Sequence, residues 1–353
     1  MKAITISLNF NPGHFSHLMA SYKLLEDCGY ESYLYINPRF NQFDENNEFR
    51  KINTPAQLAQ LSEIKIAVFW FPSIRNIWEA IRFKFFLKSQ IVYIYHEPFD
   101  SIKNYYNSGF RFKKIVKICL INIVNMPVLL LADNIILPSN AAFSLYQKKY
   151  LWINKNASRI PLLFDDETTG NITTVAKQYI SYIGTVAADH AFDKFVTFVD
   201  IAITNNWFDD MVFLIATGSQ IPEQQKAIID KHQASGRLRI SAGHFMTNAE
   251  INEHYRNSIV VWNAYNRSMQ SGVLPKAYMF GTPVIVLAKN ANEYILDDHT
   301  GILIDDNNNI QQIKDAIQKI TSNKEIFVHN CRELFLNVFF YKSKIADVKS
   351  VIR

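Results

Sequence analysis

Residues 1–36 read MKAITISLNFNPGHFSHLMASYKLLEDCGYESYLYI, and this stretch decides the fold class. The apolar run 3–8 predicts a buried strand, the turn-rich segment 9–14 predicts a loop, and the amphipathic stretch 16–28 predicts a helix that leads into a second strand over 31–36. Two strands joined by a helix form a parallel unit whose helix packs back on the sheet. The N-terminal stretch therefore predicts an α/β protein with a parallel sheet.

The same alternation of strand and helix continues along the chain. Further strands are predicted over 65–71, 91–95, 134–137, 179–183, 212–216, 238–241, 259–262, 283–286 and 301–304. Helices are predicted near 74–88, 110–131, 140–150, 190–205, 222–234, 248–257, 276–280 and 310–320, the sixth with a capping box at Thr247 and Glu250. The polar stretch 164–171 interrupts the alternation and predicts a link. A chain of 353 residues is long enough for two domains, so we expect two doubly wound parallel-sheet domains, 1–165 and 166–330.

Composition places the chain among globular proteins. Apolar residues make up 48% and charged residues 20%, with 11 Gly and 11 Pro, which excludes disordered and collagen-like chains. The three cysteines, Cys28, Cys119 and Cys331, lie far apart without the spacing of a disulfide scaffold or a zinc site. The N-terminus lacks the features of a secretory signal peptide. These features together predict a cytoplasmic protein.

The positive charge gathers in one part of the first half. Residues 1–165 carry 19 Lys and Arg against 12 Asp and Glu, whereas residues 166–353 carry 18 against 20. The span 75–117 alone holds nine basic and three acidic residues, interleaved with Trp78, Phe83, Phe85, Phe86 and Phe112. The apolar stretch 115–132 is interrupted by polar residues and Pro127, so a spanning helix is not expected.

Basic and aromatic residues in this arrangement are typical of a surface that binds anionic lipid. We therefore predict peripheral contact with a membrane. One alternative is a solvated helical face whose aromatic residues belong to the core. The other is a nucleic-acid surface, although no RNP, zinc or helix-turn-helix signature accompanies the patch, and no nucleic acid is expected as a partner.

The densest candidate for chemistry is the loop 263–283, which follows a predicted strand of the second domain. Pro275 suits the first turn of a helix and Gly281 its C-terminal end, so free backbone N–H groups are expected near 272–276. With Lys276 and the hydroxyl groups of Ser268 and Ser271, they predict an anion site without a metal. The alternative is an ordinary helix with an exposed lysine.

The run 276–285, KAYMFGTPVI, resembles the E-A-M-A-x-G-x-P-V-I run of the large retaining family in the GT-B superfamily of nucleotide-sugar glycosyltransferases. EYI at 293–295 and TGILI at 300–304 are similar to motifs that follow it, and ADNIILPS at 132–139 and YIGT at 182–185 to motifs that precede it. The resemblance implies the GT-B fold, with two Rossmann-like domains facing a cleft and a C-terminal helix over 331–353 that packs on the first domain. It also implies a hexosyltransferase that needs no resident cofactor.

The chain departs from that family at charged positions. The two glutamates of the family's Glu-x7-Glu motif, of which the second holds the donor ribose, fall on Ser268 and Lys276. Its phosphate-binding Arg and Lys fall on Thr185 and His190. A lysine at the position of Lys276 is similar to the one that the inverting xanthan glucuronosyltransferase family uses for the pyrophosphate. The stereochemistry stays open, with inversion favoured, and metal independence is predicted.

The resemblance and the loop together imply a set of donor-binding residues. Its members are Gly13, Gly184, Thr185, Phe245, Met246, Ser268, Gln270, Ser271, Gly272, Val273, Lys276 and Glu293. The loop 243–246 is expected to contact the nucleotide base, with Phe245 as a wall; its alternative role is a hydrophobic staple for the next helix.

An inverting transfer needs a base for the acceptor proton. Glu97 and Asp100, directly after the predicted strand 91–95, are the candidates. His96 is a third candidate catalytic residue, with contact to the donor sugar or phosphate as its alternative role. His14 and His17 come just after the first strand.

These expectations combine into one function. We expect a peripheral glycosyltransferase at the inner face of the cell membrane that adds a sugar from a nucleotide sugar to a lipid-linked surface oligosaccharide, such as lipopolysaccharide or capsule. The alternatives are another GT-B nucleotide-sugar enzyme such as an epimerase, a phosphorylase-like enzyme with pyridoxal, and a nucleic-acid-binding protein that uses the span 75–117.

Overall fold

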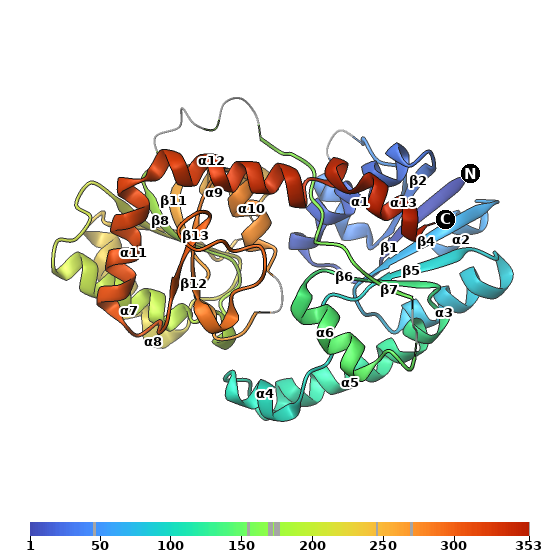
Figure 1. Ribbon diagram of the computed structural model, residues 1–353, viewed down its shortest axis with the longest axis horizontal. Coiled ribbons are helices and arrows are strands. Elements are labelled where there is room, and N and C mark those ends of the chain that lie inside the picture. Colours follow the sequence, from blue (N-terminus) through green and yellow to red (C-terminus); the bar gives the residue numbers. More distant parts are fainter. Residues whose placement is uncertain are drawn as a thin grey trace. The chain divides into compact units, whose positions relative to one another are not determined.

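The computed structural model describes residues 1–44, 47–153, 156–168, 172, 177–244, 246–268 and 271–352. The chain forms two compact units (Figure 1). The first contains Met1–Asn107, Arg111–Asp165 and Val338–Arg353, and the second contains Ser108–Phe110 and Asp166–Asn337. The main passage from the first unit to the second lies between two adjacent aspartates, Asp165 and Asp166.

The first unit is built on a seven-stranded parallel sheet of order β3-β2-β1-β4-β5-β6-β7. Its strands are β1 (Lys2–Ser7), β2 (Glu31–Ile36), β3 (Lys51–Ile52), β4 (Ile64–Trp70), β5 (Gln90–Ile94), β6 (Asn134–Leu137) and β7 (Ala157–Arg159). Its helices are α1 (Phe15–Asp27), α2 (Pro55–Ala59), α3 (Arg75–Ile81), α4 (Ile102–Asn107), α5 (Phe112–Leu131), α6 (Asn140–Lys149) and α13 (Ile345–Val351).

The second unit repeats the architecture with a six-stranded parallel sheet of order β10-β9-β8-β11-β12-β13. Its strands are β8 (Tyr179–Ile183), β9 (Val212–Thr217), β10 (Leu238–Ala242), β11 (Ser258–Trp262), β12 (Val284–Leu287) and β13 (Gly301–Ile304). Its helices are α7 (Phe192–Thr204), α8 (Glu223–Ala234), α9 (Asn248–Asn257), α10 (Val273–Met279), α11 (Ile310–Ser322) and α12 (Lys324–Leu334). The predicted pair of doubly wound parallel sheets is confirmed.

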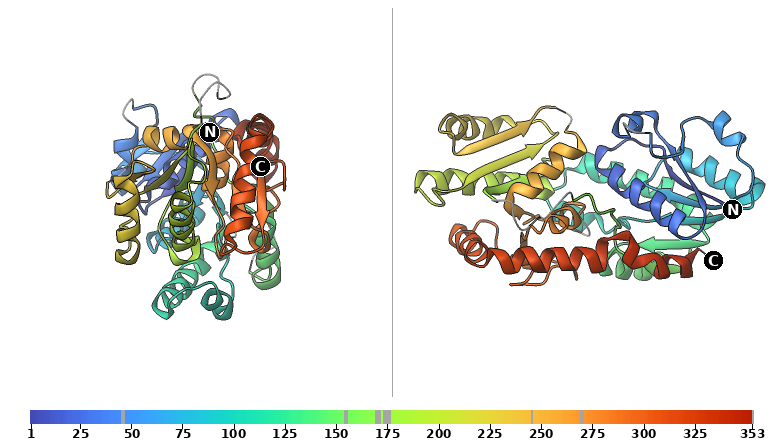
Figure 2. Two further views of the ribbon diagram at one scale, coloured as in Figure 1. Left: turned by 90° about the vertical axis from the view of Figure 1, so that its left-hand side faces the viewer. Right: turned by 90° about the horizontal axis from the view of Figure 1, so that it is seen from above.

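Each sheet is buried between its own helices, as Figure 2 shows. Every residue of β8 and β11 is buried, which explains why both read as continuous apolar runs in the sequence. Because all strands within a sheet run the same way, their carboxyl ends share one edge in each unit. Ligands of open parallel sheets bind at that edge.

Residues 331–353 do not form the single predicted helix. Helix α12 ends at Leu334, π-helical and 3-10 turns follow, and α13 begins only at Ile345. From Val338 onward the chain belongs to the first unit. The backbone of Phe164 pairs there with Phe339 and Tyr341. The expectation of one continuous helix is wrong because the segment is divided between the two units.

Helix α5 is the most apolar helix described. It is long and apolar enough to cross a membrane. Only 22% of its most apolar stretch of 18 residues is buried within the protein. Its inner side is tied to β5 by two hydrogen bonds, from Tyr93 Oη to Asn125 Oδ1 (3.0 Å) and from Tyr95 Oη to Asn122 Oδ1 (2.8 Å). The polar residues that interrupt the apolar sequence thus attach the helix to its sheet.

The aromatic residues of the basic span divide into two groups. Trp78, Phe85, Phe86 and Phe112 are 63–78% exposed, so the alternative that places them in the core is wrong. Phe83 is fully buried and packs edge-on against Phe69, which corrects its expected place on the surface. Within one helical turn, Phe83 therefore faces the core while Phe85 and Phe86 face solvent.

Candidate functional site

In the second unit, the loops after the adjacent strands β8 and β11 are bound to each other. The amide of Asn266 donates to the carbonyl of Asp189 (2.8 Å), and the His190 ring stacks on Tyr265 with 4.2 Å between ring centroids. His190 Nδ1 also lies 2.7 Å from the carbonyl oxygen of Thr185. Thr185 and His190, on which the sequence resemblance places the family's phosphate-binding cations, thus lie in one hydrogen-bonded edge.

Gly184 brings this edge close to helix α10. Its φ of +138° is one that side chains rarely adopt, and a Cβ there would lie 3.6 Å from Val273 Cγ2 and 3.8 Å from Tyr265 Oη. The structure therefore places three predicted donor residues, Gly184, Thr185 and Val273, within one small region.

Helix α10 begins at Val273, so Pro275 lies in its first turn as predicted. Gly281 follows the helix with φ +61°, and a Cβ there would lie 2.8 Å from Val328 Cγ1 and 2.9 Å from the Val328 carbonyl oxygen, which explains why glycine ends the helix. Three of the backbone N–H groups that were expected to be free are already hydrogen-bonded. The amides of Val273 and Leu274 donate to Ser271, and that of Lys276 donates to the Gly272 carbonyl, so these three are used inside the turn.

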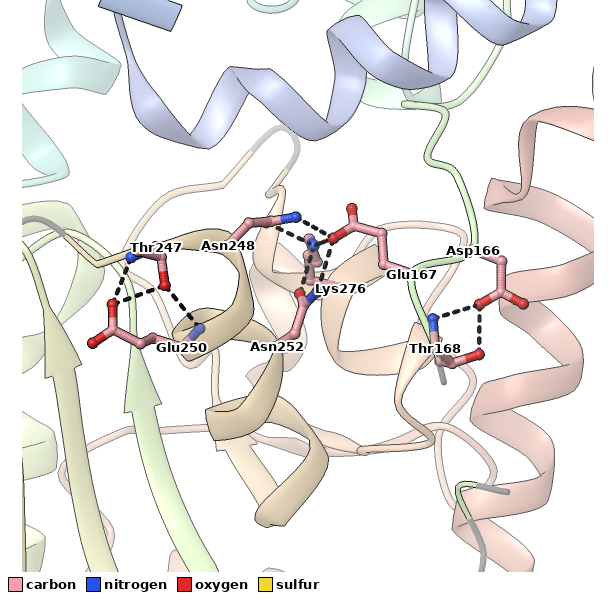
Figure 3. A network of polar contacts seen from close by, with 8 residues as sticks. All are labelled: Asp166, Glu167, Thr168, Thr247, Asn248, Glu250, Asn252 and Lys276. Atoms are coloured by element: carbon pink, nitrogen blue, oxygen red, sulfur yellow. Dashed lines mark hydrogen bonds and ion pairs between the residues drawn. The ribbon is translucent and has the colours of Figure 1, made fainter. Parts of the chain in front are cut away.

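Lys276 lies in a buried polar cluster, shown in Figure 3. Its Nζ donates to Glu167 Oε2 (2.7 Å), to Asn252 Oδ1 (2.8 Å) and to Asn248 Oδ1 (3.3 Å). Glu167 Oε2 also accepts from the side-chain amides of Asn252 (2.9 Å) and Asn248. An ammonium group has three donors, so all of them are occupied.

Burial sets the electrostatics of this cluster. The side chains of Lys276 and Glu167 are 8% and 10% exposed, which corrects the alternative of an exposed lysine. Burial holds the pKa of Lys276 below its ordinary value, while the negative charge of Glu167 opposes that shift. Direct contact of Lys276 with a diphosphate stays a prediction, and it requires the ammonium to exchange at least one present partner.

The neighbours of Glu167 fix its direction. Arg332 of α12 donates from both terminal nitrogens to the Asp166 carboxylate, and the Thr168 backbone and hydroxyl donate to Asp166 Oδ1 (3.2 and 2.8 Å). Glu167 points toward Lys276, away from the side on which Asp166 is held (Figure 3). Glu167 was not predicted as a site residue, because the polar stretch 164–171 has the composition of a link between domains. The i, i+4 spacing of Asn248 and Asn252 was the one available signal for a shared helix face.

The remaining donor residues lie on loops of the same unit or on the first unit. Met246 is buried just before α9, whose capping box is confirmed by the bond from Thr247 N to Glu250 Oε2 (2.7 Å). Ser268 and Glu293 are half-buried in the loops after β11 and β12. Gly13 is exposed, and its amide donates to Asn11 Oδ1 (3.2 Å). Phe245 and Gln270 lie outside the described residues.

In the first unit, three histidines meet at the carboxyl ends of β1, β4 and β5. The rings of His14 and His96 both stack on Phe71, with centroids 3.2 and 4.2 Å from the phenyl ring. His17 and His96 both pack on Trp70, at 5.3 and 5.1 Å. Phe71 adopts φ +56°, an uncommon conformation for a bulky residue. These loops therefore hold their rings in one fixed stack.

The environment of His14 is the most perturbed of the three. Burial, followed by the charges of His96 and His17, lowers the pKa of His14 to about 2. Its Nδ1 is buried and accepts no hydrogen bond from the residues that the structure describes. His14 is therefore a neutral imidazole at physiological pH.

The two candidate carboxylates differ in their surroundings. Glu97 is exposed, whereas both Asp100 oxygens accept from Asn104 Nδ2 at 2.9 Å at the start of α4. The assignment of the base to Glu97 or Asp100 stays a prediction.

Within the described ranges, no group of three or more His, Cys, Asp or Glu side chains is arranged to hold a metal ion.

Comparison with known proteins adds two findings. Residues 177–323 match the family model described as glycosyl transferases group 1. Among solved structures, the chain is similar to HepE of Anabaena in complex with UDP, at 12% identity and a TM-score of 0.71, covering 100% of this chain and 99% of that one. No curated protein matches the sequence.

Two more solved structures have the same fold over almost their whole length. WaaG, a glycosyltransferase involved in lipopolysaccharide biosynthesis, is 13% identical with a TM-score of 0.66, covering 100% of this chain and 99% of that one. Sucrose-phosphate synthase from Thermosynechococcus elongatus is 14% identical with a TM-score of 0.70, covering 99% and 98%. The predicted GT-B architecture is thus confirmed.

Proposed function

We propose that this chain, which has the GT-B fold, is a glycosyltransferase that moves a sugar from a nucleoside-diphosphate sugar to a hydroxyl group of a saccharide acceptor. The observation that carries the proposal is the group 1 match over 177–323, which contains Gly184, the loop after β11 and Lys276. HepE, which has the same fold, was solved in complexes with UDP and with UDP-glucose. The donor is a substrate, and no resident cofactor is proposed.

We place the donor at the carboxyl edge of the second sheet. Gly184 and Thr185 lie beside the start of α10, where glycine allows close approach of the backbone to a phosphate. As the bond between the sugar and the diphosphate breaks, negative charge grows on the leaving oxygen and must be stabilised. Lys276 supplies that charge if the diphosphate replaces one of its partners.

The acceptor side of the reaction belongs to the first unit. The acceptor oxygen attacks the anomeric carbon of the donor sugar, and the bond between that carbon and the diphosphate breaks. The acceptor proton passes to a base. We propose an inverting transfer in one such step, with Glu97, Asp100 or His96 as the base. The stacked histidines at the edge of the same sheet support placing the acceptor there.

We further propose that the acceptor is a lipid-linked surface saccharide and that the enzyme binds the inner face of the cell membrane peripherally. Four exposed aromatic rings and the exposed basic residues Arg111, Lys113, Lys114 and Lys117 support this proposal. Acidic lipids attract exposed Lys and Arg side chains, and aromatic rings insert at the interface.

Calorimetry with a panel of nucleoside diphosphates and nucleotide sugars tests the proposed function. A donor that binds the folded state should also raise the melting temperature by mass action. We expect one nucleotide to bind and its sugar derivative to be consumed when a saccharide acceptor is added. Conversion of the nucleotide sugar to an isomer without an acceptor would instead identify an epimerase, and absence of binding to every nucleotide would reject the proposal.

A further inference from the structure

The first unit contains a groove of about 650 Å³ that the proposed reaction has not yet used. One wall is the loop that follows β4 and the start of α3, with Ile74 and Arg75, and the other is helix α5, with Lys117, Leu120, Ile121 and Val124. Residues after β1 and β2 complete it. The groove therefore opens at the same edge of the sheet as the histidine stack.

The shape of the groove is fixed by hydrogen bonds in its walls. Asn9 donates from its side chain to the Pro72 carbonyl (2.6 Å), and Asn37 donates to the Leu8 carbonyl (3.2 Å), so the loops are joined. Helix α5 is held from behind by its bonds to Tyr93 and Tyr95. The groove needs no ligand to form.

The surface of the groove is apolar on the helix side. Leu120, Ile121 and Val124 lie on one face of α5. Ile74 is 67% exposed and Leu120 58% exposed, so the apolar surface continues to the mouth of the groove. Such side chains at the mouth favour a ligand with a hydrocarbon part.

The two walls also carry one cation each. Arg75 and Lys117 are both exposed, and neither has an ion-pair partner among the residues that the structure describes. A guanidinium group binds two oxygens of a phosphate through its planar fork, and an ammonium group adds a compact charge. The groove thus combines an anion-binding pair with an apolar wall.

We propose that this groove binds the phosphate-bearing lipid end of an acceptor, with the phosphate between Arg75 and Lys117 and the hydrocarbon chain along Leu120, Ile121 and Val124. The inference rests on the proposed glycosyl transfer and deepens it by defining the acceptor as an amphiphile with a phosphate next to a hydrocarbon chain. A saccharide attached to that phosphate would extend along the strand ends toward His14 and Phe71. A free sugar acceptor gives no reason for the apolar wall, and a neutral lipid gives none for the two cations.

Dodecyl phosphate, used below its micelle concentration, is a simple probe of this groove. We expect it to bind the full-length protein more tightly than inorganic phosphate or neutral dodecyl maltoside, as measured by calorimetry. The variants Arg75→Gln, Lys117→Gln and Leu120→Ser should each weaken binding about tenfold or more. All three residues are exposed, so the folded state should tolerate these changes.

Two matched controls lie in the first unit outside the groove. Lys148→Gln removes an exposed lysine of α6, and Leu130→Ser removes a leucine of α5 that is 61% exposed; neither residue lines the groove. Both variants should bind dodecyl phosphate as the unchanged protein does. Equal losses in the controls would show a diffuse surface and overturn the proposal, as would equal affinity for dodecyl maltoside or for inorganic phosphate.

Parallel measurements separate this inference from the proposed function. Binding of UDP and other nucleoside diphosphates should be the same in all five variants. If no nucleotide binds but dodecyl phosphate does with the expected pattern, the proposed function fails and the groove stands. Sedimentation tests whether a second copy of the chain covers the groove instead. A dimer that is lost with Leu120→Ser and kept with Leu130→Ser would show this and overturn the lipid assignment.

Discussion

The Nζ of Lys276 lies 2.7 Å from Oε2 of Glu167, a residue 109 positions earlier in the chain. The two side chains are 8% and 10% exposed, and two asparagines bind both of them. A carboxylate thus lies beside Lys276, the residue on which the sequence resemblance places the family's ribose-binding glutamate, but another part of the sequence supplies it.

Removing one partner of this pair should destabilise the second unit. Lys276→Met leaves the Glu167 carboxylate buried without its cation, which costs about 3–5 kcal/mol of unfolding free energy. The double variant Lys276→Met with Glu167→Gln should recover most of that loss, as measured by urea denaturation. Lys319→Met, which breaks a half-exposed pair with Asp298, should cost less than about 1 kcal/mol. Strictly additive losses in the double variant would contradict a coupled pair.

The same two residues distinguish a phosphate-binding lysine from a purely structural one. If the diphosphate replaces Glu167 on Lys276, Lys276→Ala should weaken UDP binding by about 1.5–3 kcal/mol, whereas Glu167→Gln removes a competitor and should not weaken it. Calorimetry on folded protein measures both changes, and Lys319→Ala is the control. Unchanged UDP affinity in folded Lys276→Ala would mean that Lys276 only positions its neighbours.

Metal independence is predicted because, in the proposed donor site, Lys276 and the strand-end backbone groups would supply the charge that stabilises the diphosphate. Glycosyl transfer should keep its rate after treatment with EDTA, measured as release of the nucleoside diphosphate. A loss of turnover that manganese or magnesium restores would show instead that a cation takes part.

Phe83 and Phe86 form a matched pair for the membrane proposal, since one is fully buried and the other 78% exposed. Phe86→Ser should reduce sedimentation with phosphatidylglycerol vesicles and leave stability nearly unchanged. Phe83→Ala should cost about 3–5 kcal/mol of unfolding free energy, because it empties a packed site. Changing Arg111, Lys113, Lys114 and Lys117 to Gln should also reduce vesicle binding, and added salt should weaken it. If both surface variants bind vesicles as well as the unchanged protein does, the membrane contact is rejected. A competition with DNA, run alongside, tests the alternative that the same surface binds nucleic acid.

The lowered pKa of His14 makes a prediction about acid stability. Between 6.5 and about 2 the unfolded chain binds a proton that the folded protein does not, so stability falls as the pH drops through that window. From pH 7 to pH 5 this amounts to about 2 kcal/mol. His14→Phe keeps a ring against Phe71 and removes the titrating group, so it should lose less stability over that interval. His329→Gln, at a side chain that is 76% exposed, should behave like the unchanged protein.

Burial patterns explain how much of the fold was predictable. Strands such as β8 and β11 are buried along their whole length and read as apolar runs, so their type and order followed from the sequence. The two-residue strand β3 and three-residue β7 at the sheet edges are too short to leave a periodic signal. The sequence could not show that Phe83 is buried and Phe86 exposed, because that difference depends on which face of the helical turn the sheet covers.

The site was less predictable than the fold. Lys276 was found from its place beside Pro275 and Gly281, where local backbone rules apply. Glu167 was not, since only tertiary structure brings a residue 109 positions away to the same buried cluster. The resemblance to a family identified the missing carboxylates, but it could not indicate which other residue would stand beside Lys276.

The bonds that Asn122 and Asn125 make with Tyr95 and Tyr93 have a consequence for membrane topology. A count of spans from hydropathy alone would give this chain one crossing and place its ends on opposite sides of a bilayer. Inserting α5 across the bilayer would break both bonds and leave two phenols and two amides in need of new partners, at about 1–3 kcal/mol for each group left unsatisfied in a buried place. If α5 meets a membrane as proposed, the arrangement that keeps both bonds has the helix lying along the headgroups and not across the bilayer.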